Sequence, residues 1–451
     1  MKDTKLKRLE ALGAERLADA LLELAVQNDE AADLVERLIA TQSENRQRFT
    51  VKLEALRHRQ HFIDWREASD FAHKLELMLE DLKSGTDDPE TGVELTAAFF
   101  EADGAIFHQS DDSNGSIGDV FRHDARNLFV HYASRYDNKA RLCELLIQLY
   151  ENDEYGVRDV LIECASRYLP RTAMRNLAEA LWHMAQKAQD EYQSGHYLMG
   201  VEMLARQMKD AGLFEKACRA KWPELPVAGC LDIAGVYLET GDARTALKWV
   251  ERTYGQGDFR AHERSKLLLD IYTKLGDKEK ASGVAWEIFR ACRSADTFDE
   301  LLQVIGNDQQ EEVLNDEVGI VLGFENFSTT DAAFLIEIDR IDAAEIYLLK
   351  NTAQFNGDLY TGLLPLAESM EHNGCFIAAS AVYRALLDSL LRRAQSKYYH
   401  HGVRYLRKLD SLAKSITDWK EMQTHGDYKK GIAATHSRKR SFWKRYNGVL
   451  K

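Results

Sequence analysis

The stretch that decides the fold spans residues 228–256 and reads AGCLDIAGVYLETGDARTALKWVERTYGQ. Its apolar residues recur at helical spacing up to Tyr237 and Leu238, which predicts one amphipathic helix. Gly241 predicts the end of that helix, because glycine takes the left-handed conformation that a helix C-terminus favours. Ala246 then permits a second helix to approach the first closely. The stretch therefore predicts two antiparallel helices joined by a tight turn.

The same spacing recurs: an apolar residue, a turn residue four positions later and an alanine five positions after that. Its clear copies are Tyr237–Gly241–Ala246, Tyr272–Gly276–Ala281 and Met370–Gly374–Ala379, and its looser copies are Met208–Gly212–Ala217 and Leu335–Asp339–Ala344. Thirty-five positions separate Gly241 from Gly276, and Asp339 from Gly374. Tetratricopeptide-type (TPR-type) hairpins repeat about every 34 residues and stack to bury their apolar faces. The sixty-three positions from Gly276 to Asp339 predict one degenerate unit between them, with a polar break at Asn307.

Composition favours helices. The sequence has 451 residues, only five prolines and many helix-forming residues, and no run of alternating β-branched residues predicts a sheet. A chain of this length exceeds one compact core, so several domains or one extended solenoid is expected. We therefore predict an all-α fold, an α-solenoid of helical hairpins.

Repeat character divides the chain into three predicted regions. Residues 1–195 predict an irregular, HEAT-like helical array, whose first 57 residues read as three helices. Residues 196–390 predict TPR-like helical repeats, and residues 391–451 predict a basic helical tail that packs on the repeats.

Membrane association and secretion are not expected. No stretch of about 18 apolar residues predicts a membrane span, and the charged N-terminus is unlike a secretion signal. The six cysteines lie in apolar helical contexts without CxxC pairs. Reduced core cysteines fit this pattern, so we expect a cytoplasmic protein.

One loop resembles a metal site, residues 108–121, which read HQSDDSNGSIGDVF. Asn114 and Gly115 match positions of a calcium loop, but Phe121 stands where a bidentate glutamate is needed. We interpret the segment instead as a turn at Asn114-Gly115, followed by a helix that Ser116 caps.

Charge changes sign near the C-terminus. The whole chain carries −14, whereas residues 391–451 contain sixteen Lys/Arg and four Asp/Glu and carry +12, which leaves −26 on residues 1–390. Cations that neutralise phosphates beside aromatic faces are what nucleic-acid binding needs. The candidate residues for binding a partner or nucleic acid are Arg404, Arg407, Lys408, Lys429, Lys430, Arg438, Lys439, Arg440, Trp443, Lys444 and Arg445. An alternative stays open, in which Phe442 and Trp443 dock the last helix on the repeats and the cations face acidic helices.

Three segments carry a family resemblance. They are LEALGAERLADALLELA at residues 9–25, DDSNGSIGDVFRHDARNLF at 111–129 and THSRKRSFWKR at 435–445. Together they resemble a bacterial domain-of-unknown-function family of helical proteins. The pattern Tyr398–His401, Arg404–Leu406, Leu409, Leu412, Trp419, Arg438-Lys439 and Phe442-Trp443 is also similar to the helical region that follows the zinc finger of SWIM zinc-finger proteins. The cysteine and histidine cluster of that finger is missing here, so the resemblance implies a helical-repeat architecture without an assigned activity.

No motif indicates an enzyme. The sequence contains no GxxxxGK phosphate loop, HExxH, GxSxG or Rossmann glycine fingerprint, and no cofactor is expected. We expect a non-catalytic scaffold or adaptor that binds a protein segment in the groove of consecutive hairpins. The alternative is a nucleic-acid-associated protein that uses the basic aromatic tail.

Overall fold

The computed structural model describes residues 2–59, 61–255 and 259–448 of the chain. Helices account for most of these residues, and the described chain has no strand beyond an isolated bridge between Ile63 and Ser110. The predicted all-α fold of stacked helical hairpins is confirmed. None of the helices within the described ranges is long and apolar enough to cross a membrane.

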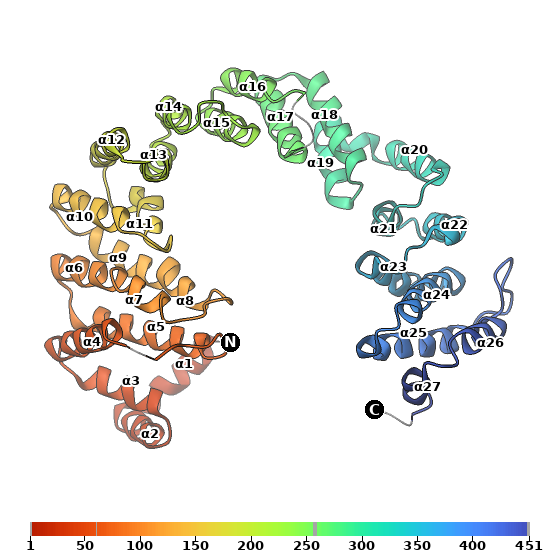
Figure 1. Ribbon diagram of the computed structural model, residues 1–451, viewed down its shortest axis with the longest axis horizontal. Helices are drawn as coiled ribbons and strands as arrows, with labels where there is room; N and C mark the ends of the chain where they lie inside the picture. Colours follow the sequence, from red (N-terminus) through yellow and green to blue (C-terminus); the bar gives the residue numbers. More distant parts are fainter. Residues whose placement is uncertain (1, 60, 256–258, 449–451) are drawn as a thin grey trace. The chain divides into compact units, whose positions relative to one another are not determined.

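The chain folds as two compact units, Met1–Tyr254 and Gly255–Lys451. Each unit has its own hydrophobic core, and its helices pack mainly on their neighbours in the chain (Figure 1). The boundary between the units follows Tyr254, whereas the sequence predicts changes of repeat character near residues 195 and 390. The three predicted regions are defined by repeat character and not by packing, so they stay predictions.

The N-terminal unit has its main core cluster between Phe49 and Ala217. Its helices are α1 (Lys2–Glu10), α2 (Ala14–Gln27), α3 (Asp29–Ile39), α4 (Gln42–Arg57), α5 (Ala68–Gly85), α6 (Pro89–Phe100), α7 (Asp103–Phe107), α8 (Ser116–Asp119), η1 (Val120–Ala125), α9 (Arg126–Ala133), α10 (Lys139–Glu151), α11 (Asp159–Glu163), η2 (Ala165–Arg167), α12 (Arg171–Lys187), α13 (Glu191–Gln207), α14 (Ala211–Lys221), α15 (Val227–Glu239) and α16 (Ala243–Glu251).

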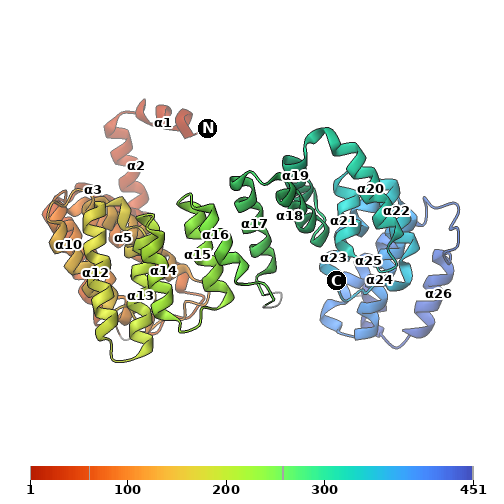
Figure 2. The same ribbon diagram turned by 90° about the horizontal axis from the view of Figure 1, so that it is seen from above.

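Residues 1–57 form four helices rather than the predicted three. Gly13 separates α1 from α2, because its positive φ of 82° interrupts the helical path. Leucines of these helices stay about half-exposed, Leu9 and Leu22 among them. Figure 2 shows α1 and α2 projecting from the end of the stack. The apolar spacing therefore predicts helices correctly here, but these leucines do not contribute to the main core.

The segment at residues 108–121 is a turn followed by a helix, as predicted, but Ser116 does not cap that helix. Gly115 turns the chain with a φ of 76°. The Asp112 carboxylate accepts hydrogen bonds from two N–H groups of the first turn of α8, at 2.8 and 2.9 Å. A carboxylate with two oxygens satisfies two of these free donors, whereas one hydroxyl satisfies only one. The Ser116 hydroxyl instead lies 3.2 Å from Ser69 Oγ.

The C-terminal unit contains two further core clusters, built from residues 285–334 and 321–442. Its helices are α17 (Ala261–Leu275), α18 (Lys278–Ala291), α19 (Ala295–Ile305), η3 (Asn307–Gln309), α20 (Gln310–Gly323), α21 (Thr329–Glu337), α22 (Ile341–Lys350), η4 (Thr352–Gln354), α23 (Tyr360–His372), α24 (Phe376–Arg393), η5 (Ser396–Tyr398), α25 (Tyr399–Leu412), α26 (His425–Thr435) and α27 (Arg440–Tyr446).

Five hairpins, found across both units, share one turn geometry. The turn residue of each is left-handed, and the next N–H donates to a carbonyl five residues earlier at 2.8–3.0 Å. The left-handed residues are Lys209, Gly241, Gly276, Asp339 and Gly374. The donor–acceptor pairs are Asp210–Ala205, Asp242–Tyr237, Asp277–Tyr272, Arg340–Leu335 and Cys375–Met370. The bond satisfies a carbonyl that the helix end would otherwise leave free. The predicted register is correct at the last four of these turns.

The first copy is shifted by three residues from its predicted position. Gly212 lies inside α14, and Lys209 takes the left-handed position with a φ of 53°. The copy is therefore Ala205–Lys209–Phe214. Asp210 accounts for the shift, because its side chain caps α14 through an N–H of the first turn at 3.0 Å and so starts the helix before Gly212.

The predicted degenerate unit is the hairpin of α19 and α20. The short helix η3, which begins at the predicted polar break Asn307, replaces the tight turn. Glu317 of α20 is 1% exposed and lies 2.8 Å from Arg290 and 3.0 Å from Arg293. Arg293 also lies 3.4 Å from Asp331 of α21. Buried charges thus connect the degenerate hairpin to the helices before and after it.

The shifted register predicts opposite outcomes for two glycine substitutions. Gly241→Ala puts a Cβ on a residue with a φ of 93° and is expected to cost about 1–2 kcal/mol of unfolding free energy. Gly212→Ala adds a Cβ inside a helix, 3.7 Å from its nearest neighbour, and is expected to be neutral or stabilising by up to about 1 kcal/mol. Urea unfolding measures both. A cost at Gly212 equal to that at Gly241 would contradict the shift.

Candidate partner-binding site

The last three helices are fixed to the core of the C-terminal unit. Phe442 of α27 is fully buried and meets the Tyr399 ring of α25 edge-on, 5.7 Å between centroids. Asp410 of α25 accepts a hydrogen bond from Lys429 Nζ at 2.7 Å and lies 2.8 Å from His425 Nε2. The Tyr446 hydroxyl donates to the same carboxylate. One aromatic ring and one carboxylate thus hold α26 and α27 on α25.

Five of the predicted binding residues have partners within this unit. Their contacts are Arg407 to Tyr446 O at 3.3 Å, Lys408 to Glu371 at 2.7 Å, Lys429 to Asp410 at 2.7 Å, Lys430 to Asp427 at 3.4 Å, and Trp443 Nε1 to His436 O at 3.0 Å. Lys408 and Lys429 form short, partly buried bonds to carboxylates, which offset their charge. A phosphate would have to displace those carboxylates.

The other six predicted residues lack an ion pair with any acidic group of the described chain. They are Arg404, Arg438, Lys439, Arg440, Lys444 and Arg445. Arg440 and Lys444 lie four residues apart and so share one face of α27. We call the last five of these cations, residues 438–440, 444 and 445, the basic edge. Arg404 belongs to a different feature, a cavity on α25.

This cavity, the C-terminal pocket, has a volume of about 320 Å³ and lies between the start of α23, the end of α24 and the start of α25. Its floor consists of buried or half-buried apolar side chains: Leu364, Leu386, Leu390 and Tyr405. Its rim carries aromatic and cationic side chains that reach solvent: Tyr360, Arg393, Tyr398, His401 and Arg404.

Two backbone features form the pocket. Gly357 lets the loop before α23 pack on α24, because a Cβ there would lie 2.1 Å from the carbonyl oxygen of Ala385. This packing brings Tyr360 to the rim. Ala394 ends α24 in the left-handed conformation with a φ of 57°, and η5 then carries Tyr398 back to the same opening.

The rim of the pocket is positively charged. Arg393 lies 3.3 Å from Asp358, and Ser389 Oγ donates a hydrogen bond to the same carboxylate. The bond from Ser389 and the charge of Arg393 lower the pKa of Asp358, which is therefore ionised at neutral pH and offsets part of the Arg393 charge. Arg404 has no such partner among the described residues, and its guanidinium carbon lies 5.5 Å from the Tyr405 ring centroid.

Other groups at the pocket add polarity without negative charge. Burial lowers the pKa of His401, and the nearby His400 and Arg404 lower it further, so its imidazole is neutral at pH 7. Helices α23 and α25 both begin at the pocket without a side-chain cap. Their N-terminal dipoles therefore add positive potential. The pocket suits a group that is apolar at one end and anionic at the other.

Of the predicted binding residues, only Arg404 lines this pocket. Tyr360 and Tyr398 are 54% and 43% exposed, and neither was among the predicted site residues. Helical periodicity cannot find them, because both stand at helix boundaries where no apolar stripe is defined. The only local signal is for Tyr398, which lies between Arg393 and His401 just after the long apolar helix α24.

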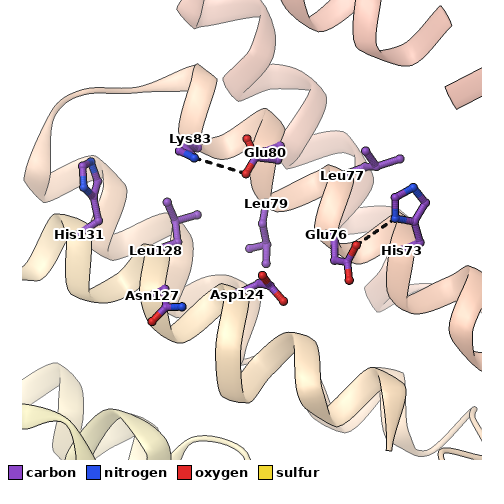
Figure 3. Close-up of a pocket in the computed structure, with 10 residues that line it drawn as sticks. All are labelled: His73, Glu76, Leu77, Leu79, Glu80, Lys83, Asp124, Asn127, Leu128 and His131. Carbon is purple, nitrogen blue, oxygen red and sulfur yellow. Dashed lines mark hydrogen bonds and ion pairs between the residues drawn. The ribbon is translucent and has the colours of Figure 1, made fainter. Parts of the chain in front are cut away.

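A second cavity, of about 550 Å³, lies in the N-terminal unit between α5 and the segment η1–α9 (Figure 3). His73 and Glu76 lie 2.9 Å apart, and Lys83 pairs with Glu80 at 3.5 Å. Burial raises the pKa of Asp124, which lies in the π-helical segment η1, and Glu76 and Glu80 raise it further. Because four of its charged or titratable groups pair with one another and it contains none of the predicted residues, this cavity is the weaker candidate.

No curated protein matches the sequence. One family model matches residues 4–221 and 226–445, which together make up nearly the whole chain. The predicted resemblance to a domain-of-unknown-function family is confirmed, whereas a bacterial origin and the similarity to SWIM zinc-finger proteins stay predictions. The chain belongs to the family of unknown function DUF6880.

Proposed function

We propose that this protein is a non-catalytic, cytoplasmic scaffold that binds a segment of a partner protein at the C-terminal pocket. The observation that carries the proposal is the pocket's composition, in which the exposed rings of Tyr360 and Tyr398 and the guanidinium of Arg404 surround a leucine floor. Tyrosine and arginine beside a water-excluding pocket dominate the binding energy of many protein interfaces.

Rigidity of the surrounding helices favours binding. Leu386 and Tyr405 belong to the same core cluster as Phe442, so the floor is held by the packing of α24, α25 and α27. The turn at Gly374 fixes α23 against α24 through the bond from Cys375 N–H to Met370 O. A preformed pocket reduces the entropy that binding would otherwise cost.

The cysteines support the cytoplasmic part of the proposal. All six are free thiols, although Cys292 is exposed and not in the core as predicted. Burial raises the pKa of Cys164 to about 11 and also raises that of Cys143, so both thiols stay protonated. Protonated thiols are poor nucleophiles, which fits structural cysteines in a reducing compartment.

A photo-crosslinking residue at Tyr360 is expected to capture a partner protein in extracts of the native host. The same residue at Tyr192, which is 88% exposed in the N-terminal unit, is the position control. Arg404→Glu should reduce capture at Tyr360 by about tenfold, because the variant removes an arginine from the rim of the proposed binding site. Lys430→Glu, at a side chain that is 83% exposed on α26, should leave it unchanged. Capture that is equal at both positions, or indifferent to Arg404→Glu, contradicts the proposal.

A second candidate function rests on the basic edge. Its five cations have no acidic partner in the described chain, and Arg438, Arg440 and Lys444 are exposed. Such cations can bind phosphates through counterion release. This observation supports nucleic-acid contact by α27 and the turn before it, independently of the pocket.

The combined substitution of Arg438, Arg440 and Lys444 by glutamine tests this second function. Removing the tail is unsuitable, because Tyr428 and Phe442 are core residues. The triple variant should bind a single-stranded oligonucleotide more weakly than the parent protein. Its plot of log K against log salt should become shallower by about 2 in slope, because each phosphate that is no longer neutralised contributes roughly 0.7. Lys430→Gln is the matched control. An unchanged slope, or no binding by the parent protein at about 50 mM salt, rules out the basic edge as a nucleic-acid site.

A further inference from the structure

We propose that the C-terminal pocket recognises a short acidic segment with one bulky apolar side chain. That side chain enters the pocket, and carboxylates beside it in the sequence pair with Arg404 and Arg393. This inference rests on the proposed scaffold function and adds the chemistry of the partner.

The floor selects the apolar side chain. Leu386 and Leu390 are buried and Tyr405 is 5% exposed, so the buried part of the lining consists of two leucines and an aromatic ring. An aromatic or large aliphatic group is stabilised when it leaves water for such a surface. A polar group there would lose its hydrogen bonds to water and find few replacements.

The rim selects the carboxylates. Arg404 lacks an acidic partner among the described residues, and Arg393 shares its charge with Asp358 over a partly exposed contact of 3.3 Å. A carboxylate can form two parallel hydrogen bonds with a guanidinium, which gives geometric specificity as well as energy. The dipole of α23, whose N-terminus has no side-chain cap, also favours a negative charge at this opening. A basic segment would meet like charge instead.

The same observations disfavour a nucleic acid as the occupant of the pocket. A base inserted among the leucines of the floor would bury its polar edges away from the hydrogen-bonding groups of the rim. A long polyanion must also approach the rest of the C-terminal unit, where residues 255–390 contain eleven Lys/Arg and twenty-four Asp/Glu and carry −13. A short acidic segment needs to contact only the rim of the pocket. Its few carboxylates can reach Arg404 without extending over acidic helices.

A matched peptide set measures this preference on the full-length protein by fluorescence anisotropy. One peptide carries a central Phe flanked by Glu, and its relatives replace Phe by Ala, or the Glu residues by Gln or by Lys. The Phe–Glu peptide should bind with a Kd below about 1 mM, and each of the Ala and Gln changes should weaken binding about tenfold, which corresponds to about 1.4 kcal/mol. The Lys peptide should not bind.

Reversing a charge on the rim is a control for misfolding, because a misfolded variant would lose binding of all peptides and would not gain binding of a new one. Arg404→Glu should lose the Phe–Glu peptide and gain the Phe–Lys peptide, while Lys430→Glu should behave as the parent. Equal binding of the Glu and Gln peptides, failure of Arg404→Glu to change the preference, or displacement of the peptide from the pocket by an oligonucleotide at lower concentration overturns the inference.

These experiments distinguish a failure of the acidic specificity from a failure of the scaffold function. If Tyr360 captures a partner that Arg404→Glu releases, but the peptides show no preference for glutamate, the acidic specificity is wrong and the scaffold function stands. If neither the crosslinking nor the peptides depend on Arg404, both are wrong.

Discussion

One backbone hydrogen bond, from the N–H after a left-handed residue to a carbonyl five residues earlier, sets the geometry on which the repeats depend. A single amphipathic helix cannot bury its apolar face alone, so each hairpin must hold its second helix on the first. The bond does this at Gly374, where it closes α23 against α24. The same hairpin then supplies the leucines of the C-terminal pocket, with Leu364 from its first helix and Leu386 and Leu390 from its second.

Much of this geometry could be predicted from the sequence wherever the left-handed residue is glycine, as at Gly241 and Gly276. Lys209 could not be predicted because residues with side chains rarely adopt positive φ, and Gly212 nearby offered a plausible but incorrect alternative. Ion pairs between residues far apart in the sequence could not be predicted either. Glu317 meets Arg290 from twenty-seven positions away, and no local pattern in α20 distinguishes it from a solvated glutamate.

The positively charged side chains of the tail have different roles, and the net charge of the segment does not show which side chain has which role. Lys408 and Lys429 stabilise the fold by pairing with carboxylates, and Trp443 packs on the core instead of standing free. The basic edge keeps its charge available, and Arg404 faces the pocket. Tyr360 and Gly357, which complete the pocket, belong to the acidic part of the sequence. The site therefore arises only when the chain folds and brings the loop that carries Gly357 and Tyr360 against the helices that carry Arg393 and Arg404.

Hydrogen exchange of the full-length protein, with and without a saturating acidic peptide that contains Phe, tests the binding site most directly. Amides at residues 359–364 and 393–405 should exchange more slowly in the complex, because these segments form the rim and receive the peptide. The amides of the basic edge should be unaffected. Protection confined to residues 438–445, or no protection around the pocket at saturation, would contradict the account.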